Sequence, residues 1–120
     1  MGYDDIRAAL TRGFFLENLH HITRLGHELL TSDQRMHPGA AYAIAVTAQK
    51  IAWYCEGYPV HDEILAVVEA HIRPKMEAVL DAVDSGGAAL VTALDGLALA
   101  YAEAQPFLKS IGVDSGPLPG

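Results

Sequence analysis

The sequence predicts an all-α protein in which four helices pack as a bundle. Apolar residues recur with the 3.6-residue period of helices, and clusters of Gly and Pro separate the periodic segments. No segment alternates apolar and polar residues in the way a half-buried strand does. Short connections favour antiparallel neighbours, and therefore a bundle. The predicted helices span residues 3–31, 39–56, 60–84 and 88–105.

Length and charge limit the function classes. A chain of 120 residues is long enough for one domain with a core, expected over residues 1–112 with a flexible tail at 113–120. The net charge of −7 makes neutralisation of phosphates unfavourable, so we expect no nucleic-acid partner. The same charge argues against an anionic membrane surface, and no uninterrupted apolar run of 18 residues predicts a membrane span.

Cysteine usage and the N-terminal residues indicate a cytoplasmic protein. Cys55 is the only cysteine, so no disulfide within the chain is expected and a reducing compartment fits. Asp4 and Asp5 stand where a signal peptide would carry basic residues. We therefore expect a cytoplasmic location.

The first predicted helix has one apolar face and one weak point. Phe15, Leu19, Ile22 and Leu29 follow the helical period and are expected to be buried. Gly13 marks a kink at which residues 3–12 can separate as a short helix of their own.

The central segment, residues 39–56, organises the rest of the prediction. It is apolar on almost every side, and a helix of this kind must be buried on most sides. We expect either the other helices or a second copy of the chain to enclose it. Gly57 is a suitable residue for the end of this helix, and Pro59 prevents its continuation.

Two prolines decide the extent of the later helices. The apolar face of the third helix keeps its phase across Pro74, which predicts one helix kinked near that residue. In the fourth helix the predicted core line includes Leu97 and Tyr101. Pro106 is expected to end this helix, with Phe107 and Leu108 folding back on the core.

Small residues form a ridge on two of the predicted helices. Small side chains let two helix axes approach closely, so we predict that the second and fourth helices pack through these ridges. The ridges consist of Ala41, Ala45, Ala48 and Ala52 on the second helix, and Ala89, Ala93, Gly96 and Ala100 on the fourth.

A second stripe on the central helix carries the candidate binding residues: Tyr42, Val46, Gln49 and Trp53, at i, i+4, i+7 and i+11. Aromatic side chains with a polar group are enriched at interfaces. Three interpretations fit: part of the core, an interface between copies, or a small-molecule pocket. A neighbouring face with Thr47, Lys50 and Tyr54 is the most polar and is expected to meet solvent.

The six histidines raise the question of a metal or haem. Glu17 and His20 have the Glu-x-x-His spacing of di-iron bundles, but the chain lacks a second copy of this motif. The helical period also turns Glu17, His20 and Arg24 towards solvent. His61 is in phase with the apolar face of the third helix and is the best placed of the six to ligate haem.

The sequence contains no complete catalytic set, so we assign no catalytic residue, no metal ligand and no cofactor. We expect a non-catalytic interaction or regulatory module that forms a homodimer through its apolar second helix and can bind another protein. The alternative is a metal- or haem-binding helical bundle, an enzyme or a sensor, that uses some of the histidines.

Overall fold

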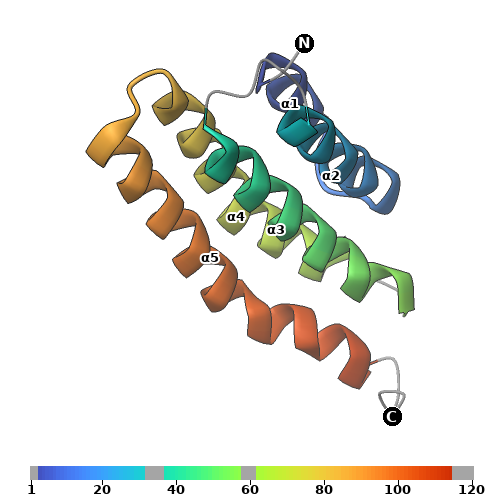
Figure 1. Cartoon of the computed structure of the whole chain (residues 1–120). Coiled ribbons are helices and arrows are strands. Elements are labelled where there is room, and N and C mark those ends of the chain that lie inside the picture. Colours follow the sequence, from blue (N-terminus) through green and yellow to red (C-terminus); the bar gives the residue numbers. More distant parts are fainter. Residues whose placement is uncertain (1–2, 32–36, 58–61, 115–120) are drawn as a thin grey trace.

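Five α-helices form the protein in the computed structural model, which describes residues 3–31, 37–57 and 62–114 (Figure 1). No strand occurs within these ranges, so the all-α prediction is confirmed. The predicted count of four helices is wrong, because the first predicted helix is two. The helices are α1 (Tyr3–Leu10), α2 (Leu16–Thr31), α3 (Pro38–Gly57), α4 (Asp62–Val83) and α5 (Gly87–Asp114).

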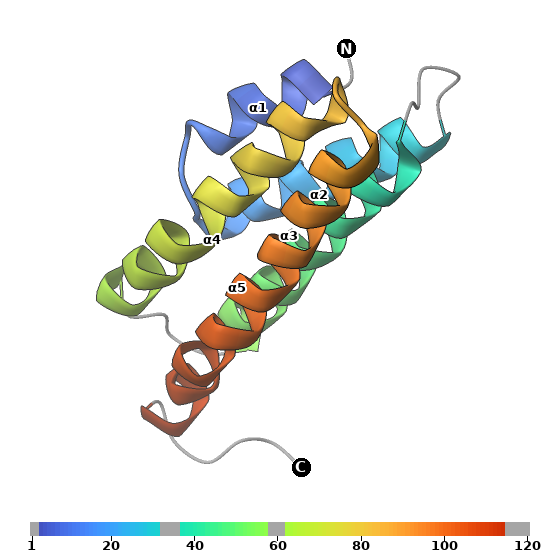
Figure 2. The same cartoon turned by 90° about the vertical axis from the view of Figure 1, so that its left-hand side faces the viewer.

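The helices pack as two pairs with α1 at one end. The most extensive contacts join α2 to α3 and α4 to α5, and smaller contacts join α3 to α5 and to α4. The short α1 contacts both α2 and α4 (Figure 2). The body measures 44 × 26 × 24 Å, and α3 lies between α2 and α5 (Figure 1).

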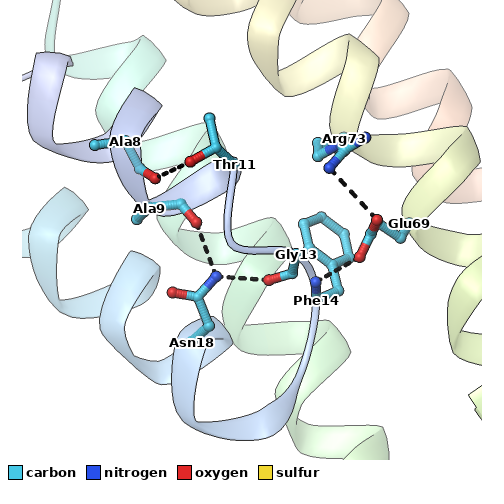
Figure 3. Close-up of polar contacts among 8 residues, drawn as sticks. All are labelled: Ala8, Ala9, Thr11, Gly13, Phe14, Asn18, Glu69 and Arg73. Carbon is cyan, nitrogen blue, oxygen red and sulfur yellow. Dashed lines mark hydrogen bonds and ion pairs between the residues drawn. The ribbon is translucent and has the colours of Figure 1, made fainter.

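The break between α1 and α2 occurs at Gly13, which has a φ of 92°. L-residues with a side chain rarely adopt this angle. The side chain of Asn18 fixes the turn, because its Nδ2 donates to the carbonyl of Ala9 at 2.9 Å and to that of Gly13 at 2.6 Å (Figure 3). Glu69 of α4 accepts a hydrogen bond from the Phe14 amide at 2.6 Å. The turn is therefore tied both to α2 and to α4.

This turn also changes which aromatic ring is buried. Phe15 was expected on the buried face, but 41% of it is exposed. Phe14 is buried instead. The reason is that α2 begins only at Leu16, so the helical phase of α2 does not extend back to Phe15.

Helix α4 runs through Pro74 without a break. Pro74 cannot donate the hydrogen bond that a helix interior requires. Val68 and Ile72 before it and Met76 and Val79 after it are nevertheless fully buried. The prediction of one helix across this proline is confirmed, and its continuous apolar face accounts for that.

Helix α5 does not end at Pro106 as predicted, but continues to Asp114. Leu108 is fully buried because it keeps the helical phase of Leu97. Burying Leu108 offsets the one hydrogen bond that Pro106 removes. Phe107 does not fold back on the core, since 48% of it is exposed.

Part of the segment predicted as a tail is helical. Residues 113 and 114 belong to α5. Residues 115–120 lie outside the described part of the chain.

The alanine ridge of α3 faces α2, so its predicted pairing with α5 is wrong. A Cβ built on Gly26 of α2 would lie 2.6 Å from the Cβ of Ala45 and 3.0 Å from the carbonyl oxygen of Ala41. All four alanines of this ridge are fully buried. On α5, Ala89 is exposed, and Gly96 has α4 as its nearest neighbour. The close approach in this fold therefore joins α2 to α3.

Candidate functional site

The outer face of α3 carries the four candidate residues, and most of that face is exposed. Tyr42 is 57% and Trp53 is 68% exposed, Gln49 is exposed and Val46 is half-buried. The opposite face of the helix is fully buried. The other helices of the chain therefore leave one stripe of α3 uncovered, and enclosure of that stripe by a second copy stays a prediction. We call these four residues, Tyr42, Val46, Gln49 and Trp53, the outer stripe.

The outer stripe borders an open groove between α3 and α5, with a volume of about 480 Å³. The two helices run side by side in Figure 1. Three residues of the outer stripe line the groove, and Tyr42 is not part of its lining. The complete lining is Val46, Gln49, Lys50, Trp53, Tyr54, Tyr101 and Gln105.

Aromatic rings and one cation determine the chemistry of the groove. The Trp53 and Tyr54 rings meet edge to face, with centroids 5.1 Å apart and planes at 75°. The ammonium of Lys50 lies 5.5 Å from the centre of the Tyr101 ring, within the range of a cation–π contact. Burial, together with the neighbouring Tyr54, raises the pKa of Tyr101 above its usual value, so its hydroxyl stays protonated at neutral pH. The groove thus presents apolar ring faces together with one positive charge, the ammonium of Lys50.

The face of α3 that the sequence assigned to solvent is exposed at Lys50, half-buried at Tyr54 and buried at Thr47, so the assignment is wrong for Thr47. Thr47 is buried, and its Oγ1 donates to the carbonyl of Ala43 at 2.7 Å. Lys50 and Tyr54 face α5 across the groove. Sequence reasoning placed Tyr101 in the core and did not select Gln105, because the period of α5 alone does not show which side meets α3.

Helix α5 adds further exposed apolar surface. Val91 is 57% and Leu99 is 62% exposed. The segment Gly87–Lys109 has a mean hydropathy of 1.2 with 22% of it buried, and by length and composition alone it could cross a membrane. Core helices of soluble proteins share this composition. Together with the outer stripe, α5 gives the protein more exposed apolar surface than its own packing requires.

Two of the described histidines lie beside carboxylates of other helices. His20 Nε2 lies 2.8 Å from Glu56 Oε1, and His71 Nε2 lies 3.8 Å from Glu103 Oε1. Among the described residues, no three His, Cys, Asp or Glu side chains are placed to hold one metal ion. His61, the candidate haem ligand, lies outside the described residues.

Cys55 is buried near the end of α3, and burial first and neighbouring Glu56 second raise the pKa of its thiol. The thiolate is the reactive form. We therefore expect alkylation by iodoacetamide at pH 7.5 to be many-fold slower in the folded than in the urea-unfolded chain, and the folded rate to keep rising above about pH 8.5, where the unfolded rate levels off. Mass spectrometry of timed samples measures both rates. Equal rates in the two states would contradict the buried position.

Comparisons with protein-family models, with curated proteins and with solved structures gave no match. A functional proposal for this chain therefore depends on its own geometry. Within that geometry the outer stripe carries the most exposed large apolar side chain, that of Trp53.

Proposed function

We propose that the protein is a non-catalytic interaction module that self-associates through the outer stripe of α3. One observation carries this proposal: Trp53, the largest apolar side chain, is 68% exposed on a helix whose opposite face is fully buried. A solvated helix face normally carries polar residues, and this one carries two aromatic rings. Tryptophan and tyrosine are the residue types most enriched among those that dominate binding energy at interfaces.

The charges of the chain support the same surface. The chain carries a net charge of −7, which makes copies repel one another in general. Tyr42, Val46, Gln49 and Trp53 carry no formal charge. Two copies can therefore approach through this surface with less repulsion than through a face that carries acidic residues, such as Glu77 and Asp81 of α4.

Light scattering after size exclusion tests this proposal. We expect the protein at micromolar concentration to have twice the 12.9 kDa mass of one chain. Trp53→Glu places a charge in the contact and removes the ring, so we expect the dimer to weaken at least about 30-fold.

The matched control is Val67→Glu, which introduces the same charge at an exposed apolar position of α4. This variant should remain dimeric. A wild-type chain that stays monomeric up to millimolar concentration would end the proposal.

The alternative of a metal- or haem-binding bundle has less support. No three potential ligands converge within the described residues, and Nε2 of His20 already lies 2.8 Å from the Glu56 carboxylate. Metal analysis and a visible spectrum of the purified protein decide this alternative directly.

A further inference from the structure

The outer face of α3 has an internal symmetry in its residue spacing. Extended by Gly39 and Glu56 at its two ends, the outer stripe has its positions at intervals of 3, 4, 3, 4 and 3, and the exposed Lys50 lies beside this row, in the lining of the groove. The spacing reads the same in both directions, and its midpoint lies between Thr47 and Ala48. The six positions are Gly39, Tyr42, Val46, Gln49, Trp53 and Glu56, of which five are exposed and Val46 is half-buried.

Alternating intervals of three and four are the spacing by which two helices pack along a shared seam. Most homodimers have a twofold axis, so each position on one copy meets its symmetry mate on the other. With a twofold axis through the midpoint of α3, Tyr42 meets the partner's Trp53 and Val46 meets the partner's Gln49. Every contact then occurs twice.

We propose that two copies pair α3 against α3 in antiparallel orientation about this axis. This inference rests on the proposed self-association and specifies its geometry. The Tyr42 ring packs on the indole of the partner's Trp53 at each end of the seam, and the two central layers combine Val46 with the aliphatic part of the partner's Gln49. Amide groups of Gln49 remain at the edge of the seam, next to the groove.

Charge decides between antiparallel and parallel pairing. A parallel pair would place Glu56 against Glu56 of the partner subunit, and like charges at a seam are destabilising. An antiparallel pair places Glu56 beside Gly39 of the partner subunit, in the first turn of the partner's α3. Carboxylates are stabilised at helix N-termini by the free N–H groups and the helix dipole. Half of the Glu56 side chain remains exposed beside His20 and is available for this contact.

The area of this contact suits a modest dimer. An enclosed Tyr or Trp buries about 150–250 Å², so the exposed parts of four rings supply roughly 350–600 Å² of the about 1,200 Å² at the lower end of stable interfaces. Val46 and Gln49 lie between the rings in the same seam and add to this area.

Disulfide trapping tests the orientation. Val46→Cys and Gln49→Cys are made separately in a Cys55→Ala background, and one of the two proteins carries a tag that distinguishes it by mass. After mixing and subunit exchange, mild oxidation should give the crosslink between positions 46 and 49 in several-fold excess over both crosslinks of like positions. Glu28→Cys, an exposed residue of α2, gives the level due to random collision.

The outcomes separate the two proposals. A dimer by light scattering in which 46–46 and 49–49 crosslinks dominate would show a parallel seam and overturn the antiparallel geometry. A dimer without crosslinks above the Glu28→Cys level would show that another face makes the contact. A monomeric wild-type chain would instead remove the proposed function itself.

Discussion

Replacing Gly26 with alanine is expected to lower the free energy of unfolding by about 1–3 kcal/mol, although alanine is the better helix former. The added Cβ would lie 2.6 Å from the Cβ of Ala45 and 3.0 Å from the carbonyl oxygen of Ala41. Neither neighbour is a flexible side chain that can rotate away. Helices α2 and α3 would have to move apart along their most extensive contact. Urea unfolding followed by circular dichroism measures the loss.

Gly96→Ala is the matched control for this experiment. Gly96 also lies within a helix, but its added Cβ would be 4.0 Å from Lys75 Cδ, which is ordinary contact. Here the gain in helix propensity should dominate and raise the stability by about 0.5–1 kcal/mol. Both variants need comparison at one protein concentration, because dimerisation adds to the measured stability. Equal effects of the two substitutions would show that α2 and α3 do not approach closely at Gly26.

The opposite expected signs show what residue periodicity can and cannot predict. The period of 3.6 locates the helices and identifies the small ridge of α3, because both depend only on neighbours along the chain. Periodicity does not predict which helix packs against that ridge, because an alanine ridge fits any smooth helix surface equally well. A single glycine in α2, Gly26, decides the partner, and its role becomes visible only when two helices are placed side by side.

Packing between helices also decides what the two prolines do and which residues complete the candidate site. Pro74 and Pro106 both lie inside helices, and in each case buried residues beyond the proline keep the helical phase.

The outer stripe was identified from spacing within one helix. Tyr101 and Gln105, which complete the groove, come from a different helix, so their place beside Trp53 depends on how α5 packs. The exposure of Trp53 likewise follows from where α2, α4 and α5 contact α3, which no periodicity within α3 indicates.

Asn18→Ala is expected to cost about 1–3 kcal/mol, because it removes two hydrogen bonds to the turn and leaves the Ala9 carbonyl with only the bond from the Arg12 amide. Asn18 is 2% exposed, and its Nδ2 serves the carbonyls of Ala9 and Gly13 on the two sides of the turn (Figure 3). The Oδ1 of the same side chain is buried without a partner, so the amide is retained for its two donor contacts. The loss should appear as earlier unfolding in urea and as faster amide exchange in α1, for example at Ile6 and Leu10.

Thr11→Ala provides the control for this turn. The Thr11 hydroxyl donates to the carbonyl of Ala8 at 2.6 Å, but the residue is exposed and water can replace the bond. Its removal should change the stability by no more than about 0.5 kcal/mol and leave exchange in α1 unaltered. Asn18 joins α1 to α2, whereas Glu69 joins the same turn to α4. If exchange in α1 stayed slow in Asn18→Ala, the contact from Glu69 would be sufficient to hold α1, and the amide of Asn18 would not be what fixes the turn.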